Sequence, residues 1–147
     1  MNEEVQEALE NAREELKRVD HLIYVSLKYT RTCDIFKSII DRLVNVVDFL
    51  FDALLHDLVE KKVIEEVPPQ AGLKCNLIKQ HVEDEEITKI VDVYLLWRLM
   101  NRADFTRARE YRRHVTMTMI INEETYEINI DNITQYYKDA KGYFEHV

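Results

Sequence analysis

Apolar residues recur every three or four positions in the first part of the chain, the spacing of one face of an α-helix. From Glu3 to about Lys28 these positions are Val5, Leu9, Ala12, Leu16, Val19, Ile23 and Leu27. A second series, from about Asp34 to Lys62, contains Ile35, Ile39, Leu43, Val46, Leu50, Leu54 and Leu58. Thr30 and Thr32 are candidate N-caps for the second helix. The pattern predicts an antiparallel helical hairpin over residues 1–62.

The apolar stripe of the second helix is unusually wide. Five more apolar residues broaden it, namely Ile40, Val44, Val47, Phe51 and Leu55. A stripe of this width must be covered on two sides. Either two neighbouring helices, or one helix and another subunit, would cover it.

Further helices are predicted over residues 72–113. Pro68 and Pro69 end the hairpin and form a linker. A modest apolar face predicts a shorter helix over residues 72–82. The acidic residues 83–86 suit the start of another helix, because carboxylates favour the positive end of a helix dipole. The apolar pattern of this helix extends through Phe105 to about Tyr111.

The periodicity changes after His114. Residues 115–121 and 125–130 alternate between apolar and polar, and a turn at residues 122–124 separates them. This pattern predicts a β-hairpin over residues 115–130. Asp131 or Asn132 would cap a final helix over residues 131–147. The expected fold is therefore mainly α: one domain, a four- or five-helix up-and-down bundle with a long N-terminal hairpin, a C-terminal β-hairpin and a final helix.

Composition supports this fold and excludes several classes of function. The 147 residues include two glycines and two prolines, too few for the turns of a many-stranded sheet. Gly72 and Gly142 cannot build a P-loop or a dinucleotide-binding fingerprint. Cys33 and Cys75 lie in helical patterns, so buried thiols are expected rather than a disulfide. The N-terminal segment is too charged for a signal peptide, and no apolar run reaches the roughly 18 residues of a membrane span. A soluble, cytoplasmic protein with no membrane partner is expected.

A cluster of arginines stands out in this acidic chain, whose formal net charge is -8. The segment Arg98–His114 reads RLMNRADFTRAREYRRH and holds six of the ten arginines. Such a cluster needs an anionic partner, either the chain's own carboxylates or an external phosphate. No HExxH or CxxC motif accompanies it, so neither a metal site nor a cofactor is expected.

The end of this segment carries groups suited to RNA chemistry. Arg109 can bind a phosphate in bidentate fashion, and the imidazole of His114 can take a proton from a ribose 2′-OH. Those two groups suffice in principle for metal-independent RNA cleavage. Candidate nucleic-acid-binding residues around them are Arg107, Tyr111, Arg112 and Arg113. The competing interpretation is a solvated basic helix end that pairs with residues 83–86 or with carboxylates of the first helix.

The arrangement resembles the HEPN superfamily of helical bundles, which carry an Arg-x(4–6)-His motif with a polar residue usually following the arginine. Arg109-x4-His114 fits this motif with Glu110 as the polar residue, and Arg107-x6-His114 fits as well. The resemblance covers Glu3 to about His114. It implies that Arg109 and His114 are a ribonuclease pair supported by Glu110, and that a homodimer brings two motifs together. The family usually continues into a helix after the motif, whereas here residues 115–130 alternate.

Two functions therefore follow from the sequence. The first is RNA binding or metal-independent endoribonuclease activity of a HEPN-type domain. The second is a non-catalytic protein-interaction or dimerisation module, which the wide apolar face of the second helix and the net acidity favour.

Overall fold

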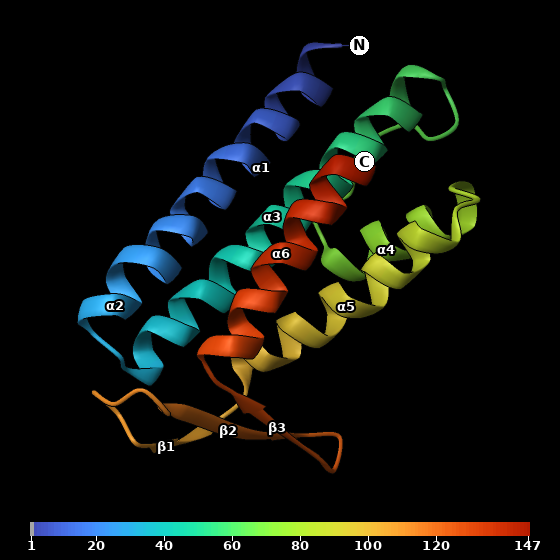
Figure 1. Ribbon diagram of the computed structural model, residues 1–147. Helices are drawn as coiled ribbons and strands as arrows, with labels where there is room; N and C mark the ends of the chain where they lie inside the picture. The colour runs from blue at the N-terminus through green and yellow to red at the C-terminus, as the bar shows by residue number, and fades with distance from the viewer. Residues whose placement is uncertain (1) are drawn as a thin grey trace.

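Two long antiparallel helical segments form the first half of the protein, as the sequence predicts (Figure 1). The computed structural model describes residues 2–147. The first segment comprises α1 (Glu3–His21), the π-helical turn η1 (Leu22–Ser26) and α2 (Leu27–Tyr29). The second is α3 (Cys33–Glu60). Thr32 caps α3, because its hydroxyl accepts a hydrogen bond from the backbone N–H of Ile35.

The π-helical turn keeps one face of the first segment on α3. Val19, Ile23 and Leu27 follow one another at steps of four residues, and all three are buried. Two such steps are longer than two turns of a regular α-helix, which has 3.6 residues per turn, so the three side chains would not stay on one face. The wider turn accommodates the extra residue.

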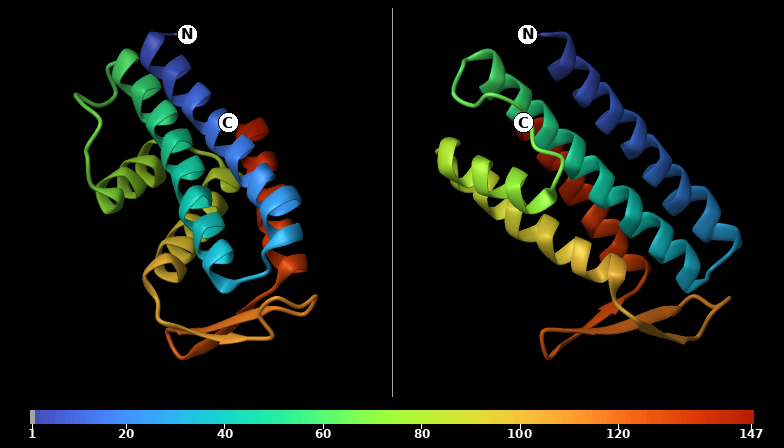
Figure 2. Two further views of the ribbon diagram at one scale, coloured as in Figure 1. Left: turned by 90° about the vertical axis from the view of Figure 1, so that its left-hand side faces the viewer. Right: turned by 180° about the vertical axis from the view of Figure 1, so that it is seen from behind.

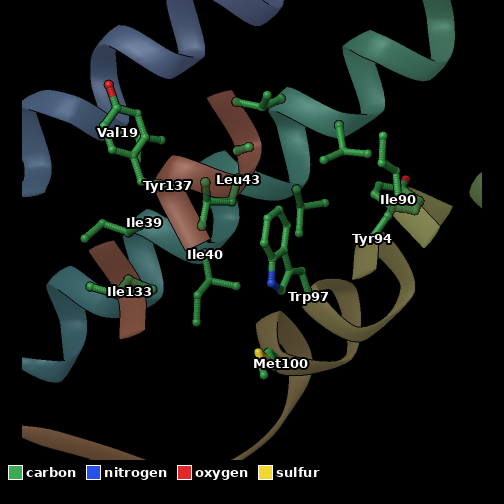
Figure 3. Close-up of a cluster of buried hydrophobic side chains, with 14 of the residues drawn as sticks. Val19, Ile39, Ile40, Leu43, Ile90, Tyr94, Trp97, Met100, Ile133 and Tyr137 are labelled. Carbon is green, nitrogen blue, oxygen red and sulfur yellow. The ribbon is translucent and has the colours of Figure 1, made fainter. Parts of the chain in front are cut away.

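Helix α3 lies at the centre of the bundle, in contact with the other long helices (Figure 2). Its wide apolar face packs against α1, α4, α5 and α6 of its own chain. Figure 3 shows the middle of this core, where side chains from four helices meet. Trp97 is 1% exposed and packs beside Tyr136, with ring centroids 5.6 Å apart. Of the two arrangements that the sequence allows for this face, neighbouring helices are therefore the one observed.

An ion triad fastens α4 (Ala71–His81) to α3. Lys74 is only 7% exposed, and its ammonium lies 2.8 Å from Asp52 and 3.1 Å from Asp48. Burial lowers the pKa of Lys74, but its bonds to the two carboxylates outweigh burial and leave that pKa above its usual value. The ammonium is therefore charged, as a buried lysine with two acidic partners should be.

Helix α5 (Glu85–Arg102) ends earlier than the sequence indicates. Its start is capped by Asp84, whose carboxylate accepts the backbone N–H of Glu86. The prediction that it continues to about Tyr111 is wrong, because the chain turns extended at Ala103 and forms β1 (Phe105–Ala108). Lys37 of α3 donates to the carbonyl of Asn101 in the last turn of α5. Residues 72–113 thus contain two helices and a strand.

The predicted hairpin is present, and β1 extends it to a three-stranded antiparallel sheet in the order β1-β2-β3. The hairpin consists of β2 (Thr116–Ile121) and β3 (Glu124–Ile128). The two-residue turn between them places Asn122 and Glu123 at φ of 52° and 69°. The sheet lies across one end of the bundle, at the opposite end from both termini (Figures 1 and 2). Its inner face buries Met117, Met119, Ile121 and Ile128.

The final helix α6 (Ile130–His146) returns from the sheet and packs against α1 and α3. Its cap is Asn129, not Asp131 or Asn132 as predicted. The Asn129 side chain accepts the N–H of Asn132, and the Asn132 side chain accepts the N–H of Asn129, at 2.9 and 2.8 Å. This reciprocal capping box places the start of α6 beside the end of β3.

The thiols of Cys33 and Cys75 are free and buried, as predicted. Within residues 2–147, no helix combines the length and the apolar composition needed to cross a membrane. Over the same range, no cluster of three or more His, Cys, Asp or Glu side chains is suited to hold a metal ion.

Candidate functional site

The arginine-rich segment is divided among three structural elements. Arg98 and Arg102 belong to α5, Arg107 to β1, and the rest to the loop between β1 and β2, residues 109–115, which we call the arginine loop. Arg98 lies over the ring of Tyr94, 5.7 Å from its centroid. The interpretation of the segment as one basic helix end is therefore wrong.

The arginine loop has a strained backbone. Arg109 and Tyr111 have φ of 55° and 65°, in the left-handed region that residues other than glycine seldom occupy. The backbone N–H of Tyr111 donates to the carbonyl of Arg31 at 2.6 Å, which ties the loop to the α2–α3 connection. Strain of this kind persists only where surrounding contacts impose it, and it is concentrated at functional sites.

Glu110 supplies a second tie between the loop and α3. Its carboxylate accepts the backbone N–H of Cys33, the first residue of α3, at 3.0 Å. It also pairs with Arg107 at 3.3 Å, and Arg107 reaches Asp34 at 2.9 Å. The hydrogen bond from Arg107 lowers the pKa of the Asp34 carboxyl. Glu110 and Arg107, both predicted site residues, thus engage each other and the start of α3.

A cleft of about 450 Å³ lies between the arginine loop and the start of α6. We call it the basic cleft. Its walls come from the α2–α3 connection, the arginine loop, the start of β2, the end of β3 and the first turn of α6. The lining residues are Arg31, Arg109, Arg113, His114, Thr116, Glu127, Asn129, Ile130 and Asp131.

Within residues 2–147, the cations of the basic cleft have no carboxylate partner. In the part of the chain that the structure describes, no salt bridge joins Arg31, Arg109 or Arg113 to a carboxylate, although Glu127 and Asp131 line the same cleft. The buried Nε of Arg31 lacks a hydrogen-bond partner in residues 2–147. The positive end of the α6 dipole adds to the field of these groups. The cleft is therefore suited to an anion with several acceptor oxygens, such as a phosphate.

The structure brings some predicted site residues together and separates others. Arg109, Arg113 and His114 line the basic cleft. Tyr111 and Arg112 are exposed on the same loop but are not among the lining residues. The competing interpretation, that the basic segment pairs with residues 83–86 or with α1 carboxylates, is not observed in residues 2–147. Arg107 pairs with Asp34 and Glu110 instead, and the partner of Asp84 is His146.

Arg31 was not predicted as a site residue. In the sequence, Arg31 is marked only by its place in the short segment between two long predicted helices. Glu127, Asn129 and Asp131 also lie outside the predicted site, since they belong to the end of the hairpin and the start of α6 rather than to the arginine segment. These residues enter the cleft through the fold, not through nearby sequence.

Comparison of the chain with models of protein families, with curated proteins and with solved structures finds no match.

Proposed function

We propose that the basic cleft binds a phosphate of an RNA chain and cleaves the chain beside it without a metal ion, as the HEPN resemblance implies. One observation carries the proposal. Arg109 and His114, paired on sequence grounds, line one cleft together with Arg31 from a distant segment, and the three guanidiniums of that cleft are free of carboxylate partners in residues 2–147.

In the proposed reaction, His114 removes the proton of a ribose 2′-OH. The 2′ oxygen attacks the adjacent phosphorus, the bond from phosphorus to the 5′ oxygen breaks, and a 2′,3′-cyclic phosphate forms. The imidazolium returns its proton to the leaving 5′ oxygen. Arg109 and Arg113 stabilise the charge that develops on the phosphorane oxygens. Because His114 is exposed at the cleft, a substrate can reach it directly.

The other predicted site residues take supporting roles in this proposal. Glu110 is a positioning residue, since its carboxylate holds the arginine loop to α3. Arg107 holds Glu110 in turn. Arg112, exposed on the same loop, adds long-range attraction for a polyanion.

The experiment is cleavage of a labelled single-stranded RNA by purified protein in EDTA. His114→Ala and Arg109→Ala are expected to lose at least about 100-fold in rate, the usual size of a general-base or charge-stabilising contribution. His21→Ala is the matched control, because His21 is exposed on α1 and outside the cleft. An RNA with a single 2′-deoxy sugar at the scissile position is expected to bind and resist cleavage. Equal cleavage by wild type and both variants, or none by any, would overturn the proposal.

A homodimer and a cytoplasmic location complete the proposal and stay predictions. The dimer follows from the HEPN resemblance, and light scattering on the purified protein measures it directly. The alternative of a non-catalytic interaction module loses one of its arguments, because the wide face of α3 is covered within the chain. It would gain support if the protein were inactive on RNA yet dimeric.

A further inference from the structure

We propose that the RNA bound at the basic cleft is single-stranded, and that Tyr29 and Tyr111 form a stacking subsite for its bases. This inference rests on the proposed function for its phosphate site. The two tyrosines are the most exposed large apolar side chains of the described chain, at 78% and 75%.

Tyr29 and Tyr111 differ from the other six tyrosines of the sequence. Each of those six has an aromatic ring partner or a hydrogen bond through its hydroxyl, as for Tyr24 beside Tyr137 and Tyr126 bonded to Glu124. In residues 2–147, the rings of Tyr29 and Tyr111 have neither kind of partner. They are therefore not explained by packing of the fold.

Tyr111 belongs to the arginine loop, and Tyr29 is the last residue of α2, just before the connection that supplies Arg31. Tyr111 lies between Arg109 and Arg113 in the arginine loop, and its backbone N–H donates to the carbonyl of Arg31 at 2.6 Å. Tyr29 precedes Arg31 by two residues, a backbone reach of at most about 7 Å. The two rings thus start from backbone that adjoins the backbone of Arg31, one of the arginines that line the cleft.

The backbone of Tyr111 gives a second, independent observation. A bulky residue at φ of 65° is strained, and glycine or asparagine would fit that position at lower cost. The loop nevertheless holds a tyrosine there, with its ring in solvent. Backbone strain of this kind is concentrated at functional sites.

Exposed aromatic rings beside arginines match the chemistry of a single strand better than that of a duplex. Bases in a duplex stack on one another, whereas unstacked bases of a single strand can stack on protein rings while arginines contact the backbone. Stacking of this kind tolerates any base, because every base has an aromatic face. The subsite therefore selects for strand state and not for sequence.

The test is binding of a fluorescein-labelled oligouridine, 2′-O-methylated to prevent cleavage, measured by anisotropy with full-length protein. Tyr29→Leu and Tyr111→Leu are each expected to weaken binding by about tenfold, and Tyr29→Phe and Tyr111→Phe to retain it. Leu keeps the strain at position 111, so the comparison isolates the ring. Tyr24→Leu is the control, since Tyr24 is a half-exposed tyrosine with a ring partner in the fold. Inorganic pyrophosphate has no base, so its inhibition constant as a competitor is expected to be the same in all variants.

The outcomes separate the two proposals. Wild-type binding that both Leu variants retain, or equal affinity for the oligonucleotide and its duplex, overturns the stacking subsite and leaves the phosphate site standing. Wild-type protein that binds no oligonucleotide, or binding unchanged by Arg109→Ala, overturns the proposed function itself. Loss of binding by the Leu variants with recovery in the Phe variants supports the subsite.

Discussion

Glu110 offers a sharp test of how the arginine loop is held, because its carboxylate joins backbone positions 77 residues apart. The substitution Glu110→Ala removes the acceptor for the Cys33 N–H and one partner of Arg107. Glu110→Gln keeps an acceptor oxygen of the same shape but removes its charge. The pair of variants therefore separates the hydrogen bond from the ion pair.

The expected loss of unfolding free energy depends on how exposed each lost contact is. The Cys33 N–H belongs to a buried residue at the start of α3 and bonds at 3.0 Å, so losing its charged acceptor costs about 1.5–2 kcal/mol. The side chain of Arg107 is 43% exposed and keeps Asp34, so its share is about 0.5 kcal/mol or less. Glu110→Ala is thus expected to lose about 2 kcal/mol, or roughly 4–8 °C in Tm for a chain of this size. Glu110→Gln is expected to lose about half as much.

Urea unfolding followed by far-ultraviolet circular dichroism measures both values. Glu65→Ala is the control, because Glu65 is exposed in the connection between α3 and α4 and has no hydrogen bond or salt bridge in residues 2–147. If Glu110→Ala unfolds within about 0.5 kcal/mol of wild type, Glu110 does not hold the loop. A Glu110→Gln variant that is stable but as inactive on RNA as His114→Ala would instead make Glu110 a catalytic residue.

Three further predictions concern the fold. Lys74→Ala is expected to lose about 2 kcal/mol in urea unfolding, because it leaves Asp48 and Asp52 facing each other; both are partly exposed, which keeps the loss below that of a fully buried pair. Glu123→Gly is expected to stabilise the protein by about 0.5 kcal/mol, since the left-handed φ of 69° strains Glu but not Gly, and an unchanged or lower unfolding free energy contradicts this. Burial raises the pKa of Tyr94 above its usual value of about 10. The contribution of Tyr94 to the free energy of unfolding is therefore fully present below about pH 10 and is lost as the pH rises toward the folded-state pKa. Absorbance at the phenolate band is expected to show this tyrosine ionising only as the protein unfolds.

The elements set by local pattern could be predicted, and those set by distant contacts could not. The helical hairpin and its Thr32 cap follow from apolar spacing and one side chain. The strand β1 was predicted as helix because Phe105 also fits the apolar face of α5. Its strand conformation comes from pairing with β2, in which Phe105 lies opposite Met119. A strand of only four residues is too short to show an alternating apolar pattern, so its pairing with β2 could not be predicted from the sequence.

The candidate site shows the same division. Residue chemistry was enough to select Arg109, Arg113 and His114. It could not show that Glu110 would turn toward the N–H of Cys33. Nor could it show that Arg31 would complete the cleft, because the Tyr111–Arg31 bond joins residues that are 80 positions apart in the sequence. Selecting the residues needed only their functional groups, whereas assigning their roles needed the fold.

The π-helical turn Leu22–Ser26 has a consequence for how this protein can vary in length. In a regular helix, Leu27 would be rotated by about 80° from Val19, away from α3. The turn stores one surplus residue, so removing a residue within it yields a regular helix with Leu27 still facing α3. Removing a residue elsewhere in α1 rotates the preceding face by about 100° and exposes part of the core. Relatives of this chain that are one residue shorter in this segment are therefore expected to have lost it at residues 22–26, with Arg31 kept in its place at the basic cleft.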